Sequence, residues 1–272
     1  MPEITVVQKG CCQFIQFNSF AQCHRIIHGF TTRQGGVSKE PFDDLNMALH
    51  VEDNPAHVRA NRKIACQALG IDSEQLVAAI QVHGKRVEVV GPEHRGRGAL
   101  QYDTALPDAD ALITNSPGVP LSSYYADCVP ILFYDPVKIC VGLTHAGWRG
   151  TVQRIAAETV KRMSEVFGSI PGDILVGVGP SIGACCYQVD EPVQQRVASQ
   201  FKQWQELLKP VGVGHWQLDL WETNRQVLLE VGVKPEHIVV AGLCTACHND
   251  MFFSHRADKG KTGRMASLIM IK

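Results

Sequence analysis

The sequence predicts an α/β protein in which a mixed β-sheet is flanked by helices in layers. Segments with apolar residues at three- and four-residue spacing alternate with short runs rich in β-branched residues, which is the pattern of helices packed on a sheet. Hydrophobic residues fill 45% of the 272 positions and charged residues 19%, the balance of a globular protein with a large core. The chain contains no internal repeat, low-complexity tract or Pro/Ser-rich linker, so we predict a single domain over residues 1–272.

Capping residues, apolar spacing and glycine stops predict four helices. The first begins after Asp53 or Asn54, carries Pro55 in its first turn and ends at Gly70. The other three are expected over 152–167 before Gly168, from Asp190 through Val197 to Phe201, and from Asp219 to Gly232.

Short apolar runs between these helices predict the strands of the sheet. They are Leu76–Val82, Val87–Val90, Leu121–Tyr125, Ile131–Tyr134, Ile139–Leu143, Ile174–Val178, Ile238–Ala241 and Leu268–Ile271. The polar, glycine-rich stretch 92–107 is predicted to be a long loop. Because only a few residues join the two strands on either side of Cys128, we expect part of the sheet to be antiparallel.

The overall charge and hydropathy favour small-molecule partners. A formal net charge of −1 offers no electrostatic attraction for nucleic acid or an anionic membrane, so an anionic ligand must be met by local arginines or backbone amides. No segment reaches the roughly 20 continuous apolar residues that cross a bilayer, and the N-terminus lacks the features of a signal peptide. Several of the ten cysteines lie in apolar runs, where a thiol behaves as a small buried hydrophobe. We therefore expect a reduced, cytoplasmic protein without a membrane partner.

Three polar residues inside apolar sequence are the strongest candidates for chemistry. His83 lies where QVHG turns the chain, Cys128 lies at a break between two strands, and His145 ends a strand directly before a helix. Ligand sites in α/β proteins gather at such strand ends. Each residue alone is more often an inert core residue, but two imidazoles and a thiolate supply three protein ligands for zinc and leave a fourth position open. An open position is typical of catalytic zinc, so the three are predicted to be both metal ligands and catalytic residues.

The AGWRGT turn after His145 is a candidate anion site. Gly147 and Gly150 allow close approach to the backbone, and Arg149 supplies a guanidinium beside the unpaired amides of a helix expected to start near Thr151. An ordinary tight turn with a surface arginine explains the same residues equally well.

Other donor-rich loops add weaker candidates. Arg33 lies among hydroxyl and amide side chains in HGFTTRQGGVS, and GPSIGACCYQVD could form a second wall of a pocket. Cys244 and Cys247 form a CxxC pair, which alone is weak evidence for zinc because a closed structural site needs four ligands. A redox pair is the alternative. The favoured interpretation is a polar loop near the site, from which Arg256 or Arg264 contacts a ligand.

These motifs together resemble a known family. QVHG, ADCVPILFYDP, GLTHAGWRGT, GPSIGACCYQVD and the ending FFSHR through TGR closely match the YfiH/YlmD family, also called the multicopper polyphenol oxidase or laccase-domain family. The resemblance spans nearly the whole chain. Its histidine, cysteine and histidine metal ligands correspond to His83, Cys128 and His145, with zinc as the usual metal and copper as the alternative. It also implies a fold likened to cysteine-hydrolase-like deamidases.

The resemblance implies purine nucleoside chemistry with nucleosides and phosphate as partners. The expected reactions are phosphorolysis of adenosine, inosine and S-methyl-5′-thioadenosine, and deamination of adenosine to inosine. Zinc would lower the pKa of a bound water for attack on the purine ring, while Arg149 and Arg33 are the candidates for binding phosphate. The residue that protonates the leaving base is left open among Asp127, His28 and His255.

Three other functions are compatible with parts of the pattern. Cys128 activated by His145 would make a metal-free thiol hydrolase or amidase, acting on a cell-wall precursor or another amide. A copper-dependent polyphenol oxidase needs paired histidine motifs, and the eleven scattered histidines argue against it. A zinc-stabilised binding protein without activity is the remaining alternative.

Overall fold

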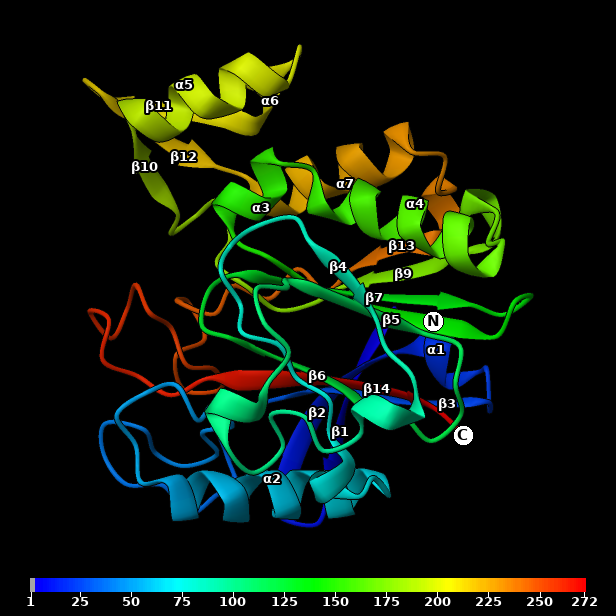
Figure 1. The fold of residues 1–272 in the computed structure, drawn as a ribbon. Helices are drawn as coiled ribbons and strands as arrows, with labels where there is room; N and C mark the ends of the chain where they lie inside the picture. Colours follow the sequence, from blue (N-terminus) through cyan, green and yellow to red (C-terminus); the bar gives the residue numbers. More distant parts are fainter. Residues whose placement is uncertain (1–2) are drawn as a thin grey trace.

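The computed structural model describes residues 3–272 and shows a four-layer arrangement: helices, a six-stranded sheet, a five-stranded sheet and a helix (Figure 1). In order across the six-stranded sheet, the strands are β13 (Ile238–Val240), β9 (Leu175–Val178), β7 (Val129–Asp135), β8 (Cys140–Ala146), β5 (Ala111–Thr114) and β4 (Val87–Val89). The five-stranded sheet contains β1 (Ile4–Lys9), β2 (Cys12–Phe17), β3 (Ile26–Thr31), β14 (Met265–Ile271) and β6 (Leu121–Tyr125). A small third sheet contains β10 (Gln188–Asp190), β12 (His215–Leu218) and β11 (Leu208–Gly212).

The structure contains seven α-helices within residues 3–272. They are α1 (Asn18–Ala21), α2 (Pro55–Leu69), α3 (Trp148–Val152), α4 (Ile155–Phe167), α5 (Glu191–Gln200), α6 (Trp204–Leu207) and α7 (Leu220–Glu230). Figure 1 shows α3, α4 and α7 along the six-stranded sheet, α2 beneath the five-stranded sheet, and the small sheet with α5 and α6 at one corner. No helix within residues 3–272 is long and apolar enough to cross a membrane.

Alternating side chains of the strands fill the spaces between these layers. On β7, Ile131 and Phe133 face the core beneath α4 and α7, whereas Leu132 and Tyr134 face the core between the two sheets. Both faces of this strand are buried, which explains its uninterrupted apolar sequence. Two strand pairs of the six-stranded sheet, β4 with β5 and β13 with β9, are parallel and the others antiparallel. The predicted α/β class with a mixed sheet and packed helices is thus confirmed, but the strands divide into separate sheets, and helices cover only one face of the six-stranded sheet.

The ends of α2 follow the predicted local signals. Asn54 Oδ1 accepts a hydrogen bond from the Ala56 N–H at 2.9 Å, Pro55 occupies the first turn, and Gly70 ends the helix at φ 75°. The buried face of this helix, which includes Val58, packs toward the five-stranded sheet.

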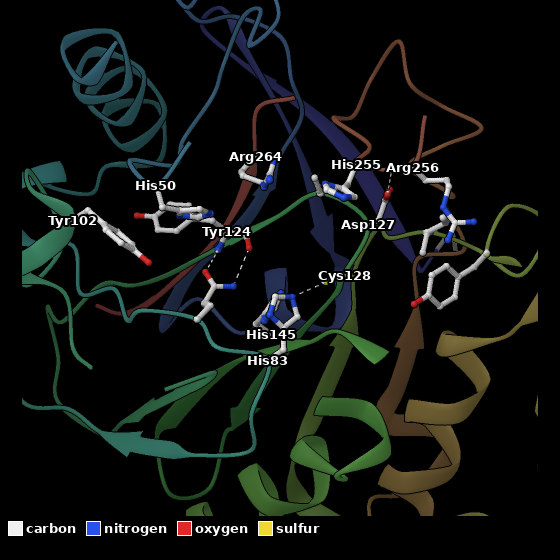
Figure 2. Close-up of a pocket in the computed structure, with 14 residues that line it drawn as sticks. His50, His83, Tyr102, Tyr124, Asp127, Cys128, His145, His255, Arg256 and Arg264 are labelled. Carbon is white, nitrogen blue, oxygen red and sulfur yellow. Dashed lines mark hydrogen bonds between the residues drawn. The ribbon is translucent and has the colours of Figure 1, made fainter. Parts of the chain in front are cut away.

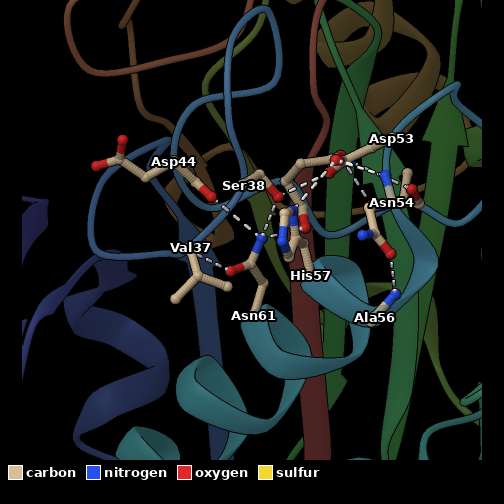
Figure 3. A network of polar contacts seen from close by, with 10 residues as sticks. Val37, Ser38, Asp44, Asp53, Asn54, Ala56, His57 and Asn61 are labelled. Carbon is tan, nitrogen blue, oxygen red and sulfur yellow. Dashed lines mark hydrogen bonds and ion pairs between the residues drawn. The ribbon is translucent and has the colours of Figure 1, made fainter.

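A polar network ties the loop before α2 to that helix (Figure 3). The buried side chain of Asn61 donates to Ser38 Oγ at 2.8 Å and to the carbonyls of Asp44 and Asn46, and it accepts from the Val37 N–H at 2.8 Å. This network fixes a long stretch without regular secondary structure against the five-stranded sheet.

Four of the predictions about elements were wrong. The strands around Cys128 do not pair with each other: β6 belongs to the five-stranded sheet and β7 to the six-stranded sheet. Asp127, at φ 84°, turns the chain from one sheet into the other. Leu76–Val82 is no regular strand, because its backbone divides its hydrogen bonds among 97, 106 and 120 instead of one neighbouring strand.

The third error concerns the helix after His145. It is broken, because α3 ends early and Arg154 adopts the left-handed conformation at φ 64° before α4 begins. The Thr151 N–H donates to the Gly147 carbonyl at 2.8 Å, so it is not available to an anion. Strands β1, β2, β3, β5, β10, β11 and β12 were not predicted. The fourth error is the loop predicted from His28 to Ser38, which begins only after Thr31 because Ile26–Thr31 forms β3.

Candidate metal centre and adjoining pocket

His83, Cys128 and His145 meet in space although they come from three separate segments (Figure 2). His145 lies near the end of β8 and Cys128 lies in the crossing between β6 and β7. His83 has left-handed backbone geometry, with φ 59°. The ligand-type atoms of the three residues lie within 4.8 Å of one another, and His83 Nε2 is 3.9 Å from Cys128 Sγ. The structure thus brings together the three residues that the sequence singled out.

A buried carboxylate that the sequence analysis missed organises this group. Asp110, directly before β5, has its Oδ1 atom 2.8 Å from His145 Nδ1. Its two oxygens also accept the backbone N–H groups of Val82, His83 and Gly84. Asp110 therefore orients both histidines and leaves His145 Nε2 for another partner. The only sequence signal was an acidic residue directly before an apolar strand.

Burial and neighbouring charges shift the ionisation of this group. Burial raises the pKa of Cys128, but His145 and His83 outweigh this effect and lower it to about 6. Burial lowers the pKa of His145, but Cys128 and Asp110 raise it to about 9. Burial likewise raises the pKa of Asp110, while its hydrogen bonds with His145 and the backbone bring it below its ordinary value. In the metal-free protein at neutral pH, the pair is therefore a thiolate beside an imidazolium.

The donor set fits a zinc ion. Ligands at about 2.0 Å for nitrogen and about 2.3 Å for sulfur place neighbouring tetrahedral donors about 3.5 Å apart. The 3.9 Å between His83 Nε2 and Cys128 Sγ is within a small side-chain adjustment of that value. A carboxylate behind a ligating histidine, as Asp110 stands behind His145, is the usual support of such a site.

The two glycines of the predicted anion turn act here through packing. A Cβ atom at Gly147 would lie 2.8 Å from His83 Cδ2 and 3.0 Å from Cys128 Sγ. A Cβ atom at Gly150 would lie 3.1 Å from the carbonyl oxygen of Gly84. The absence of side chains at both positions therefore allows the three segments to approach one another.

Gln81 connects the segment that carries His83 to the strand that precedes Cys128. Its side-chain Nε2 donates to the Tyr124 carbonyl at 2.9 Å, and its Oε1 accepts the Tyr124 N–H at 3.0 Å. This pair of hydrogen bonds substitutes for strand pairing at the edge of β6. Gln81 was quoted within the QVHG motif but not recognised as a positioning residue.

A cavity of about 490 Å³ opens beside the metal-ligand group. It is lined by His50, Gln81, His83, Tyr102, Tyr124, Ala126, Asp127, Cys128, His145, Ile182, Tyr187, His255, Arg256 and Arg264. At one end the His50 ring lies 5.5 Å from the Tyr102 ring and 6.3 Å from the Tyr124 ring, centroid to centroid. Burial, together with nearby arginines, lowers the pKa of His50 to about 4, so the ring is neutral. This end of the cavity therefore presents two tyrosine rings and an uncharged imidazole (Figure 2).

The opposite side of the cavity is built around Asp127. One carboxylate oxygen accepts the Thr245 hydroxyl and the other accepts the Arg256 N–H, both at 2.7 Å. The Asp127 carbonyl also accepts the Ile182 N–H at 3.0 Å. Asp127 therefore holds in place the loop that contains Ile182 and the loop that contains Thr245 and Arg256. Its role beside Cys128 is to position these two loops.

The arginines of the pocket are Arg256 and Arg264, whereas Arg33 and Arg149 lie elsewhere. Arg33 donates to the carbonyls of Asp43 and Asn249, at 3.0 and 2.8 Å. Arg149 stacks on Trp148 at 4.9 Å and lines a separate surface hollow. The structure therefore does not bring either residue into the cavity beside the metal ligands.

Of the three candidates for a proton donor, two line the cavity. His28 lies within β3, where its Nε2 accepts the Phe17 N–H at 2.9 Å. Burial lowers its pKa to about 4, and it lines none of the cavity. Asp127 and His255 do line it.

The chain is similar to known proteins in sequence and in fold. The family model described as "Multi-copper polyphenol oxidoreductase laccase" matches residues 27–272. The chain is 45% identical over 247 residues to the purine nucleoside phosphorylase YlmD of Bacillus subtilis, covering 91% of this chain and 89% of that protein. It is 34% identical to a purine nucleoside phosphorylase of Bacteroides thetaiotaomicron, covering 95% and 96%. The crystal structures of Bacillus licheniformis YfiH and Geobacillus stearothermophilus YlmD each superpose with a TM-score of 0.94 at 40% identity, covering all of both chains.

Proposed function

This chain belongs to the multi-copper polyphenol oxidoreductase laccase family, and from that membership we propose that it is a zinc-dependent purine nucleoside phosphorylase. The reaction converts a purine nucleoside and phosphate into the free purine base and ribose 1-phosphate. The observation that carries the proposal is one cavity that combines the three metal ligands, an aromatic end and two arginines. The names of the similar bacterial proteins support the same reaction.

The cavity residues divide into base-binding and phosphate-binding groups. Tyr102 and Tyr124 offer aromatic faces to the purine, beside the neutral ring of His50. Arg264 and Arg256 line the cavity and supply guanidinium groups for the phosphate. The position of Arg264 is fixed by its bonds to the Thr262 and Gly263 carbonyls, at 2.6 and 2.9 Å. The phosphate-binding role predicted for Arg33 and Arg149 has no support from their positions.

His83, Cys128 and His145 would hold the metal ion. A zinc ion there supplies Lewis-acid chemistry at its open position. Asp110 keeps His145 in the orientation that this requires. In phosphorolysis the bond between ribose C1′ and the base nitrogen breaks as a phosphate oxygen bonds to C1′, and the base takes up a proton. Because both oxygens of Asp127 already accept hydrogen bonds, His255 is assigned as the proton donor.

The substrates that we assign for phosphorolysis are adenosine, inosine and S-methyl-5′-thioadenosine. We also assign a second reaction to the same cavity, the deamination of adenosine. Deamination consumes water and releases ammonia as adenosine becomes inosine. Its support is the open position that three protein ligands leave on a metal, next to a cavity that accommodates a purine.

A product assay tests the proposal. Purified protein of known metal content is given adenosine or inosine, with and without phosphate, beside Cys128→Ala and the control Cys11→Ala, which removes an exposed thiol elsewhere. We expect the wild type and the control to release the base only when phosphate is present. Cys128→Ala should lose this activity and should also lose one bound zinc ion. Absence of base and inosine under every condition, with zinc bound, would refute the nucleoside function.

The second candidate is a thiol hydrolase, favoured by one observation. Asp110, His145 and the ionised Cys128 form the carboxylate, imidazole and thiolate series of a cysteine nucleophile. The likeness to cysteine hydrolases implied by the resemblance belongs with this candidate. Turnover of an amide by metal-free protein, stopped by alkylation of Cys128 and also by zinc, would identify it.

Copper-dependent phenol oxidation has weak support. Within residues 3–272, two groups of histidine, cysteine or acidic residues are close enough to hold a metal ion, and neither contains the paired histidines of a trinuclear copper cluster. Copper in place of zinc at the three-ligand site remains compatible with the donors present.

A further inference from the structure

Four cysteines converge at a second place in the molecule. Cys185 and Cys186 lie between β9 and β10, and Cys244 and Cys247 lie in the loop after β13. Their four sulfur atoms lie within 4.8 Å of one another. The CxxC pair, which by itself was weak evidence for a metal, is thus completed by two ligands about sixty positions earlier in the chain.

The sulfur separations fit a single tetrahedral metal ion. Cys247 Sγ is 3.5 Å from Cys185 Sγ and 3.4 Å from Cys186 Sγ. Four thiolates at about 2.3 Å from zinc lie about 3.8 Å apart, which requires only a small adjustment. A cluster with several irons would need its cysteine sulfurs spread farther apart around the metals.

Backbone geometry at Cys244 matches a metal-bound thiolate. Its sulfur accepts the backbone N–H of Gly183 at 3.2 Å. Hydrogen bonds of this kind stabilise charge on sulfur, whereas a buried neutral thiol does not require them. A Cβ atom at Gly183 would lie 3.3 Å from both Cys185 Sγ and Cys244 Cβ, so the absence of a side chain there gives the sulfurs room.

The loops that carry the four cysteines are already aligned with each other. Ser181 forms an isolated bridge with Cys244, and the Thr245 N–H donates to the Ser181 carbonyl at 3.0 Å. Arg256 Nη1 donates to the Cys186 carbonyl at 3.3 Å. The first loop supplies Ile182 and the second supplies Arg256 to the large cavity. A metal ion here would therefore bind together the two loops that form one wall of that cavity.

We propose that Cys185, Cys186, Cys244 and Cys247 form a structural zinc site, closed by four thiolates and separate from the site at Cys128. Binding converts four S–H groups into four Zn–S bonds and releases up to four protons, without any change of oxidation state. All four coordination positions are taken by protein, so this ion has a structural role and no open position for substrate. The chain then holds two zinc ions with different roles.

Metal counting on protein purified under reducing conditions tests the site. We expect two zinc ions per wild-type chain, one in Cys247→Ser, one in Cys128→Ala and none in the double variant. The control Cys11→Ser, an exposed thiol outside both groups, keeps two. Cobalt bound to Cys128→Ala should show the intense charge-transfer and d–d bands of a tetrahedral four-sulfur site, and this measurement needs no variant of the four cysteines.

Several results would overturn the proposal. The first is an unchanged zinc content in Cys247→Ser, and the second is a cobalt spectrum of Cys128→Ala without four-sulfur bands. A disulfide among the four cysteines in protein purified without an oxidant would show that they are a redox group. Iron in place of zinc would overturn the identity of the metal. Because the two zinc ions are removed by different variants, failure here does not affect the site at Cys128.

Discussion

Asp110 is the residue on which the geometry of the metal centre depends most. It accepts hydrogen bonds from three successive backbone N–H groups around His83 and from the ring of His145. A single carboxylate thereby fixes ligands from two separate segments. It is a positioning residue, since it touches neither the cavity nor the position of the metal.

Replacing Asp110 with asparagine is expected to weaken zinc binding. The asparagine amide retains part of the hydrogen bonding to the backbone, but it lacks the negative charge that supports and orients the His145 ring. Zinc affinity should therefore fall about 10- to 100-fold. Competition with a chromophoric chelator measures this change. The control is Asp108→Asn, an exposed aspartate two positions earlier, at φ 50°, which asparagine tolerates. Equal zinc affinity in Asp110→Asn and wild type would contradict the assigned role.

The ionisation of Cys128 leads to a prediction about pH. In metal-free protein its pKa of about 6 means that thiolate forms as the pH rises through 6, well below the ordinary value of 9.0. The rate of alkylation at Cys128 should therefore rise to a plateau above about pH 7. His145→Ala removes the largest stabilising charge and should move the midpoint upward. A midpoint above pH 8 in the otherwise unchanged protein would contradict the thiolate–imidazolium pair.

At the scale of elements, α2 and the loop before it depend on one buried amide. Asn61 makes four hydrogen bonds, three of them with the backbone of Val37, Asp44 and Asn46 (Figure 3). Asn61→Ala removes all four bonds from a buried position and should lower the free energy of unfolding by about 3 kcal/mol. Urea denaturation measures the loss, with Lys63→Ala on the exposed face of α2 as the control. Losses of equal size in both variants would show that the network is not what stabilises this element.

Elements that depend on neighbouring residues in the sequence were predicted better than elements that depend on distant residues. Helix ends such as Asn54 and Gly70 were predictable because a cap is set by a few neighbouring residues. The pairing of β6 and β7 was predicted wrongly, because the left-handed turn at Asp127 sends them into different sheets. Strand β1 was missed although it contains a β-branched run, and none of its side chains is fully buried.

The site was predictable where residues stand in distinctive motifs and not where contacts come from the fold. His83, Cys128 and His145 interrupt apolar sequence, which drew attention to them. Asp110 and His50 act through neighbours that only the folded chain brings close. The same reason hid the four-cysteine group, since half of it appeared as an isolated CxxC.

At the scale of the whole molecule, the candidate site lies where the two large sheets meet. Cys128 is in the crossing between them, His145 is on the six-stranded sheet and Tyr124 is on the five-stranded sheet. The sheets share an apolar core that includes Leu121 and Leu132. The geometry of the site therefore depends on both sheets keeping their relative position.

This shared core leads us to expect one cooperative unfolding transition. Far-UV and near-UV circular dichroism should give the same midpoint, and excess zinc should raise it, because the ion binds the folded state. Removal of metal with a chelator should lower it. Two transitions, in which the sheets unfold one after the other, would show that the predicted single domain is instead two units.

The most direct test of the account is the stoichiometry of phosphate and base. Inosine and phosphate are incubated with zinc-loaded protein, and the released hypoxanthine, the ribose 1-phosphate and the phosphate consumed are measured together. The account predicts one of each per turnover, and none with Cys128→Ala. Base released without consumption of phosphate would show hydrolysis, and no base released by fully zinc-loaded protein would contradict the nucleoside function.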